Sequence, residues 1–216
     1  MTAFRPRLAG IAVGVMLAVT DCMPVATTGP STGIEQISSV AFHAGMRKLW
    51  EDHITWTRLY IVSAVAGLPD LGPTADRLLQ NQADIGNAIV PFYGQAAGHQ
   101  LTALLRQHIL TAAALVAAAK AGDATAVAIQ KDLWYANADQ IADFLAAANP
   151  AWPDAEMRQM MKTHLDQTLD EARARLKGDY PADIAAYDAV HLHILEMADM
   201  LADGIVTQFP NRFTSS

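Results

Sequence analysis

Three histidines recur along the chain at nearly equal spacing, and they are the residues best suited to chemistry. They are His53, His108 and His164, separated by steps of 55 and 56 residues. Imidazole nitrogen binds zinc, copper and iron, and the side chain also gains and loses a proton near neutral pH. Three imidazoles that met at one point would form a metal site or an acid–base site.

Helical spacing predicts that all three histidines face inward. The residues three and four positions before them are apolar: Leu49 and Trp50, Leu104 and Leu105, and Met160 and Met161. Residues three and four apart lie on one face of a helix, so each imidazole shares an apolar face. A glycine follows each histidine after fourteen residues and ends an apolar run: Gly67, Gly122 and Gly178. We therefore expect the three histidines at one level, about 20 Å from the turns at about 1.5 Å per residue.

The same histidines also fit a structural role. A polar residue on an apolar face can be held by a hydrogen bond to a carbonyl, or to a hydroxyl such as that of Thr57 or Thr168. Duplication of a segment would also copy the residue without any function. Equal height along the helices does not by itself make three side chains converge. Metal ligands and packing residues are thus both open interpretations of these positions.

A second recurring residue is an aspartate that follows an alanine: Asp84, Asp139 and Asp199. Each aspartate is about 200° around the helix from the core positions two residues away, which points it outward. We expect solvated or capping carboxylates rather than companions of the histidines. Better inward polar candidates are Gln82 and Asn137, with Met197 at the matching place. His193 and Glu196 share a helix face and could supply a peripheral ligand pair.

The sequence predicts six helices, which would position these residues. Apolar residues recur at three- and four-residue steps, and glycine or proline marks the ends. The expected helices cover residues 40–66, 74–90, 95–121, 124–148, 154–177 and 182–208. No strand is expected. Six helices predict an all-α, up-and-down bundle of three repeated helical hairpins over residues 39–210. An open array of stacked hairpins is the alternative.

The first 22 residues read as a secretory signal peptide. Arg5 and Arg7 precede a twelve-residue apolar stretch from Leu8 to Val19, which is too short to span a bilayer comfortably. Cys22, the only cysteine, follows and resembles the lipidated first residue of a bacterial lipoprotein, although Asp21 departs from the small residue of that pattern. The alternative is a cleaved leader with an incidental cysteine. In both cases we expect an exported protein, periplasmic or held to a membrane only through a lipid anchor at Cys22.

Composition and missing motifs narrow the partners and activities. The 15 basic residues are scattered in a chain of net charge −7, so a nucleic-acid partner is not expected. Residues 23–38 are rich in Pro, Gly, Ser and Thr and read as a tether, and residues 211–216 read as a polar tail. The sequence has no Glu-x-x-His, His-Glu-x-x-His, Gly-x-Ser-x-Gly, haem-attachment, phosphate-loop or dinucleotide motif. Nothing in the sequence therefore supports a hydrolase or a nucleotide-dependent enzyme.

Several blocks resemble a family of small bacterial all-helical proteins without an established activity. The blocks are LWEDHITWTRLYIVSAVAGLPD, PFYG, KAGD, WYANADQIADFL and MADMLADGIVTQFP. The resemblance covers residues 49–210 and implies a shared fold. It transfers no activity, cofactor or site residue.

These observations favour a binding protein of the bacterial cell envelope that holds a transition metal through His53, His108 and His164. The alternative is a structural or protein-interaction module in which the three histidines are packing residues and the partner is another protein. A metal-dependent enzyme is the third interpretation, and the sequence offers it no nucleophile.

Overall fold

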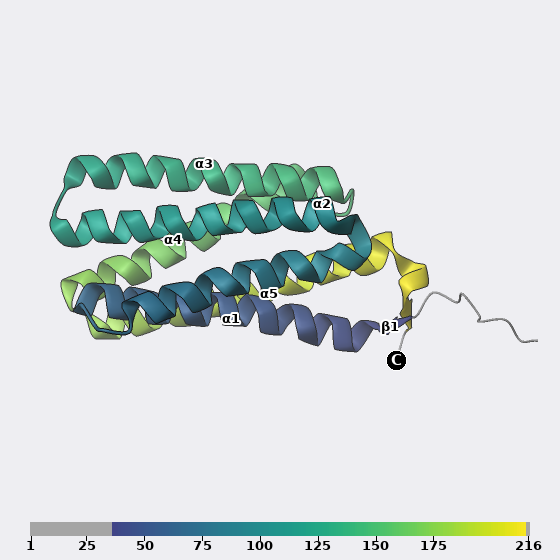
Figure 1. Ribbon diagram of the computed structural model, residues 1–216, viewed down its shortest axis with the longest axis horizontal. Coiled ribbons are helices and arrows are strands. Elements are labelled where there is room, and N and C mark those ends of the chain that lie inside the picture. Colours follow the sequence, from purple (N-terminus) through teal and green to yellow (C-terminus); the bar gives the residue numbers. More distant parts are fainter. Residues whose placement is uncertain (1–35, 215–216) are drawn as a thin grey trace, which may run out of the picture. The chain divides into compact units, whose positions relative to one another are not determined.

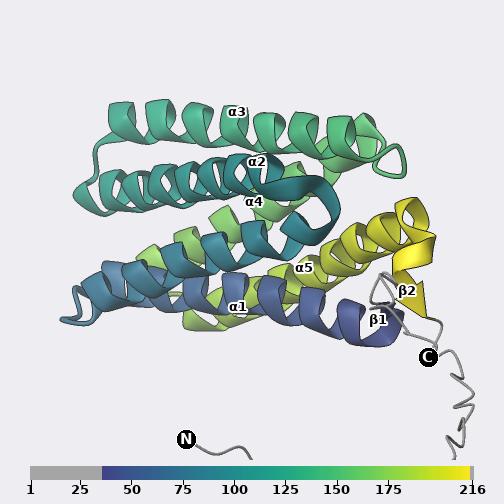
Figure 2. The same ribbon diagram turned by 45° about the vertical axis from the view of Figure 1, so that its right-hand side comes forward.

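The computed structural model describes residues 36–214, which form an all-α bundle (Figure 1). The signal-peptide segment, Cys22 and most of the tether lie outside the described residues. The described part contains five α-helices: α1 (Ser39–Ala66), α2 (Leu71–Ala121), α3 (Ala124–Ala148), α4 (Asp154–Lys177) and α5 (Tyr180–Gln208). Helix α1 packs against α2 and α5, and α4 packs against α3 and α5 (Figure 1; Figure 2). The first helix thus contacts the last, and the bundle is closed.

The prediction of six helices in three repeated hairpins is not supported in the described residues, because α2 spans both the expected helix 74–90 and the expected helix 95–121. Pro91 lies inside α2, and Gly94 alone leaves the helical conformation, with φ 82° and ψ 169°. Proline removes one backbone donor and bends a helix, and glycine adopts a positive φ without strain. The chain therefore turns at a single residue, without the loop that would separate two hairpins.

The bend in α2 brings its two halves into close contact. A Cβ atom added at Gly86 would lie 2.6 Å from the carbonyl oxygen of Gly98, and one at Gly98 would lie 2.8 Å from that of Gly86. Both separations are shorter than any ordinary contact of a side chain with backbone. The two glycines therefore allow the backbones to cross at this point.

Local signals place the ends of three helices, at Ala66, Ala121 and Lys177, as expected. Gly67, Gly122 and Gly178 each cap a helix in the left-handed conformation, with φ of 68°, 73° and 73°. Asp123 and Asp179 accept hydrogen bonds from backbone N–H groups in the first turns of α3 and α5. These caps fix the turns that end α1, α2 and α4 at one end of the bundle, at the left of Figure 1.

The opposite end is closed by aromatic rings and by two short strands that the sequence did not predict. Strand β1 (Ile37–Ser38) pairs in parallel with β2 (Phe213–Thr214), just after a 3-10 turn (Pro210–Arg212). Phe213 is buried and stacks on Phe92 with centroids 5.5 Å apart. The end of the tether and the start of the expected polar tail are therefore part of the fold, because Phe213 is drawn into the core.

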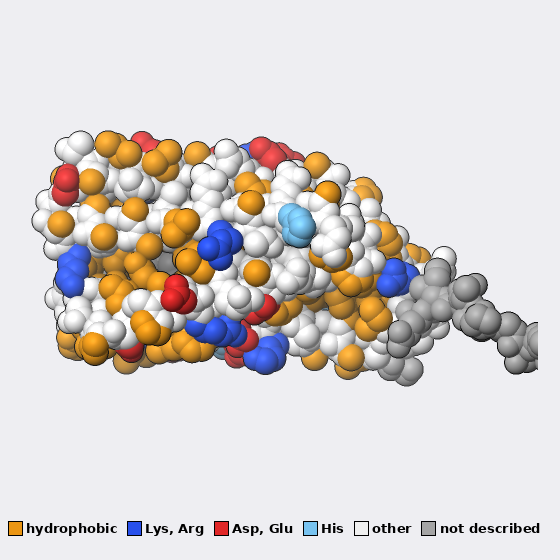
Figure 3. All heavy atoms as spheres, viewed as in Figure 1, with side chains coloured by type: hydrophobic (Ala, Val, Ile, Leu, Met, Phe, Trp, Pro, Cys, Tyr) orange, Lys and Arg blue, Asp and Glu red, His pale blue; other side chains and the backbone are white. Residues whose placement is uncertain are grey.

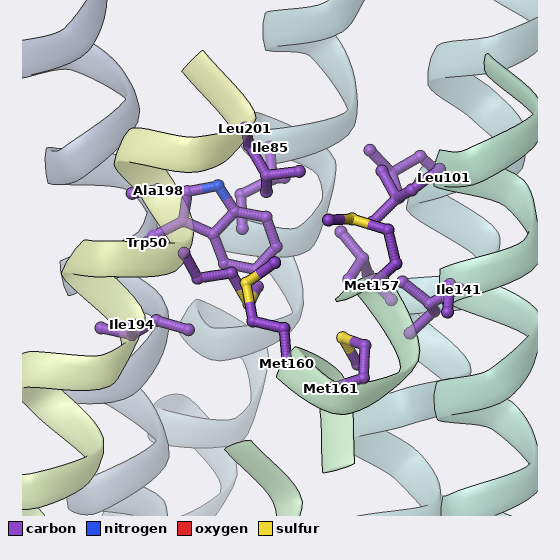
Figure 4. Packing of buried hydrophobic residues seen from close by; sticks show 14 of the residues in the cluster. Trp50, Ile85, Leu101, Ile141, Met157, Met160, Met161, Ile194, Ala198 and Leu201 are labelled. Atoms are coloured by element: carbon purple, nitrogen blue, oxygen red, sulfur yellow. The ribbon is translucent and has the colours of Figure 1, made fainter. Parts of the chain in front are cut away.

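Methionines of α4 fill the middle of the core. Met160 lies beside Trp50, while Met157 and Met161 point toward Leu101 and Ile141 (Figure 4).

By length and composition α2 is the one described helix that could cross a membrane, which is weak support for a span.

Candidate functional site: a buried histidine cluster

The structure brings the three recurring histidines together in the core. His53 comes from α1, His108 from α2 and His164 from α4, and each is no more than 3% exposed. The ring centroids are 6.5 Å apart for His53 and His108, 5.6 Å for His53 and His164, and 6.0 Å for His108 and His164. We call these residues the histidine cluster.

Two of the three rings are held by buried amides. Gln82 Nε2 donates a hydrogen bond to His53 Nδ1 at 3.2 Å, and His108 Nδ1 donates to Asn137 Oδ1 at 3.1 Å. Because the Asn137 oxygen can only accept, the neutral His108 ring carries its proton on Nδ1 and a lone pair on Nε2. Helical phase had identified both Gln82 and Asn137 as inward polar residues, and both are fully buried.

A second set of hydrogen bonds fixes the neighbouring helices at this level. In each case a side chain donates to the carbonyl four residues before a cluster histidine. The bonds run from Asn81 Nδ2 to Leu49 O (3.0 Å), from Asn137 Nδ2 to Leu104 O (3.2 Å) and from His193 Nε2 to Met160 O (3.1 Å). His193, rather than Met197, is thus the third polar partner.

The third histidine differs from the other two. His164 Nδ1 is buried and has no hydrogen-bond partner among residues 36–214, and the same holds for Gln82 Oε1. Buried polar atoms are nearly always satisfied by protein, water or a bound ion. The cluster therefore keeps unused hydrogen-bonding and ligating capacity.

Burial keeps the cluster neutral. Desolvation lowers the pKa of His53 to about 4, against the opposing effect of the bond from Gln82. Desolvation, and after it repulsion from His53, lowers the pKa of His108 to about 3, against the opposing effect of the bond to Asn137. The pKa of His164 is lowered well below its usual value, first by burial and then by the neighbouring histidines. At neutral pH all three rings are therefore the uncharged imidazoles that metals bind.

The three rings as they stand do not form a metal site. Within the described part of the chain, no group of three or more His, Cys, Asp or Glu side chains is arranged to hold a metal ion.

The repeated aspartates stay away from the cluster, as helical phase predicts, and their side chains pair with arginines at the surface. The pairs are Asp84 with Arg77, Asp139 with Arg158 and Asp199 with Arg47.

A second buried polar cluster escaped the sequence analysis. Arg58 on α1 donates to Glu171 Oε1 on α4 at 2.8 Å and to Asp183 Oδ1 on α5 at 2.7 Å, and Arg175 adds a contact to Asp183 at 3.3 Å. Both carboxylates are fully buried. Glu171 lies seven residues after His164, on the same helix face, which was the one available signal. We call Arg58, Glu171, Arg175 and Asp183 the charged cluster.

The two carboxylates of the charged cluster differ in pKa. Burial raises the pKa of Glu171 to about 7, although Arg58 opposes the shift. Burial would also raise the pKa of Asp183, but hydrogen bonds and attraction to Arg58 and Arg175 outweigh it and lower that pKa. Asp183 thus carries the negative charge near neutral pH, and Glu171 is close to its midpoint.

Comparison with protein-family models, with curated proteins and with solved structures finds no match to this chain. The family resemblance stated from the sequence stays a prediction.

Proposed function

We propose that the protein is a non-enzymatic binding protein of the bacterial cell envelope that holds one transition-metal ion (zinc, copper or iron) through His53, His108 and His164. The observation that carries the proposal is the spacing of the three rings, 5.6–6.5 Å between centroids. Two imidazoles bonded to one ion at about 2 Å place their centroids roughly 5–6 Å apart. The helices therefore already stand at a distance that suits a shared ion.

The protonation of the rings supports the same proposal. His108 presents a lone pair on Nε2 because Asn137 holds its Nδ1–H, which is how an outer amide orients a metal-bound histidine. No described residue hydrogen-bonds to the Nε2 of His53, His108 or His164. His108 Nε2 therefore already presents a lone pair, whereas His53 Nε2 carries the ring proton as long as Gln82 donates to Nδ1.

Binding requires local changes in side chains. The rings must rotate so that their Nε2 atoms converge, since they do not converge as they stand. His53 must move its proton to Nδ1, and rotation of the Gln82 amide would offer the unpartnered Oε1 as acceptor for it. That rotation gives up the bonds from Gln82 Nε2 to Leu78 O at 2.8 Å and to Asn81 Oδ1 at 3.2 Å, which the bound ion must offset.

The second candidate function is a structural or protein-interaction module with packing histidines. It is favoured by the hydrogen bonds that Gln82 and Asn137 already make, which satisfy much of the cluster without an ion. This alternative predicts a folded protein that binds no metal at the cluster.

Metal content of the folded protein distinguishes the two. Untagged protein is dialysed separately against micromolar Zn²⁺, Cu²⁺ and Fe²⁺, and bound metal is measured by elemental analysis. We expect about one equivalent of one metal in the wild type and a loss of most of it in His108→Ala. His99→Ala is the matched control, because His99 is an exposed histidine of the same helix. A folded wild type that binds none of these ions, or a His108→Ala variant that binds as the wild type does, would exclude the metal site.

Export is a separate part of the proposal and rests on residues 1–22. The expected product is a mature chain that begins at or near Cys22. Mass spectrometry of protein from a bacterial host tests this directly. A lipid mass that disappears in Cys22→Ala identifies an anchor, a leader removed without added mass identifies a periplasmic protein, and an unprocessed chain in the cytoplasm contradicts export.

A further inference from the structure

An apolar cavity lies one helical turn from the histidine cluster, toward the end where the helices turn. Its volume is about 90 Å³, and α1, α2, α3 and α4 line it. Thr57, Ala112 and Thr168 line it, each four residues after a cluster histidine, and so does Trp134, whose ring lies 5.3 Å from that of His108. On the face shown in Figure 3, hydrophobic side chains gather toward this end around a small hollow.

Few polar groups line the cavity besides the two threonines: they include the hydroxyl of Tyr60 and the indole of Trp134, whose buried Nε1 has no hydrogen-bond partner among residues 36–214. The hydroxyls of Thr57 and Thr168 already donate to the carbonyls of His53 and His164, both at 2.8 Å. The other lining side chains are mostly aliphatic, among them Ile61, Leu78 and Val116. A cavity of this kind stays dry, because a buried water needs two to four polar partners. Its natural occupant is an apolar group.

Charge at the edge of the cavity has one sign. Lys131 on α3 and Arg173 on α4 are the charged side chains among the described residues that line it. Lys131 lies over the ring of Tyr135 and makes no ion pair within the described chain, and Arg173 reaches only Asp170 of its own helix at 3.5 Å. Two exposed or half-buried cations thus stand beside an apolar hole in a protein of net charge −7.

We propose that this cavity binds a short fatty acid, with the alkyl chain between the four helices and the carboxylate at Lys131 and Arg173. A cavity of about 150 Å³ admits a benzene ring, so the present one, at about 90 Å³, encloses roughly the last three or four carbons of an alkyl chain, and the carbons nearer the carboxylate lie at its mouth. The aliphatic lining contacts the alkyl chain, and the positive charges of Lys131 and Arg173 attract the carboxylate.

The head group and the chain can be tested separately. Binding of octanoate and of 1-octanol to the full chain is measured by calorimetry, without added metal, so that the result does not depend on the histidine cluster. We expect octanoate to bind about three- to tenfold more tightly than 1-octanol, and this preference to vanish in the Lys131→Gln, Arg173→Gln double variant. Equal affinities of the wild type for the two compounds would overturn the role of the cations.

The position of the chain is tested by filling the cavity. Ala113 lines it, whereas Ala117 is an exposed residue of the same helix. Ala113→Leu places three more carbon atoms where the alkyl chain would lie and should weaken octanoate about tenfold or more, while Ala117→Leu should bind as the wild type does. Circular dichroism and thermal melting check that both variants fold. Unchanged affinity in a folded Ala113→Leu, or no octanoate binding to the wild type, would overturn the proposal.

Discussion

The histidine cluster and the charged cluster bury polar side chains between the same two helices, α1 and α4, in opposite ways. The histidine cluster is neutral, because burial lowers the pKa of each imidazole. The charged cluster keeps its charge, because Arg58 and Asp183 stay ionised and paired. An imidazole can lose its proton on burial, whereas a guanidinium cannot and must find carboxylates. The side-chain type thus decides whether a buried group needs a counter-charge or only an amide.

The largest expected effect is that of acid on the free energy of unfolding: the histidine cluster should lower it, and the charged cluster should raise it. Below pH 6.5 the unfolded chain takes up protons on His53 and His108 that the folded protein does not, since their folded pKa values are about 4 and about 3. The free energy of unfolding then falls by roughly 2 kcal/mol for each buried histidine between pH 7.5 and 5. Glu171 acts in the opposite sense, because its pKa of about 7 lets the folded protein take up a proton first.

Glu171→Gln separates the two contributions. Protonation of Glu171 raises the free energy of unfolding by about 2–3 kcal/mol over the same pH range, which offsets part of the loss. We expect the wild type to lose roughly 3–4 kcal/mol and Glu171→Gln to lose roughly 6 kcal/mol. Urea denaturation at the two pH values, with a chelator present, measures both. Equal losses would mean that Glu171 does not titrate in this range, and no loss would mean that the histidines are not neutral.

Removal of the one cation shared by the charged cluster is the second largest effect. Arg58→Met leaves Glu171 and Asp183 buried with only Arg175 nearby, and we expect the free energy of unfolding to fall by about 3–5 kcal/mol. Arg47→Met is the matched control, because Arg47 on the same helix pairs with Asp199 at the surface and should cost no more than about 1 kcal/mol. Urea denaturation at pH 7.5 compares them. Similar costs for the two variants would show that burial does not strengthen the Arg58 contacts.

In the histidine cluster the side-chain amide of Asn137 corresponds to Arg58 in the charged cluster, because it bonds to two groups at once. Asn137→Leu removes the hydrogen bond to the carbonyl of Leu104 and leaves the buried Nδ1–H of His108 without a partner, which should lower the free energy of unfolding by about 2–3 kcal/mol. Met197→Leu is an apolar control at a buried position of α5, expected to cost less than about 1.5 kcal/mol. Equal costs in urea denaturation would mean that packing, and not hydrogen bonding, holds the cluster.

The histidine cluster was predictable from the sequence because its signals are local. An imidazole three or four residues after apolar side chains shows its inward phase within one helix, and the glycine fourteen residues later sets its height. Gln82 and Asn137 followed from the same reasoning. The bend of α2 was interpreted as two helix ends because Pro91 and Gly94 stop most helices, and the close contact of Gly86 with Gly98 across the bend could not be read from periodicity.

The charged cluster was not predictable in the same way. Arg58 meets partners 113 and 125 residues away, and each of these side chains alone resembles an ordinary surface charge. The third polar partner of the histidine cluster was missed for a related reason. His193 donates to a backbone carbonyl, a contact that leaves no mark in the pattern of side-chain types. Contacts between distant segments need the packed helices, which periodicity within one helix does not determine.

The smallest expected effect distinguishes two histidines within one cluster. His164→Leu removes a ring whose Nδ1 has no partner among residues 36–214, so it should change the free energy of unfolding by no more than about 1 kcal/mol. His108→Leu has nearly the same shape change but leaves Asn137 Oδ1 buried and unpaired, which should cost about 1–3 kcal/mol. Urea denaturation with a chelator present measures both variants. If His164→Leu costs as much as His108→Leu, His164 Nδ1 is hydrogen-bonded in solution, and the spare ligating capacity inferred for the cluster does not exist.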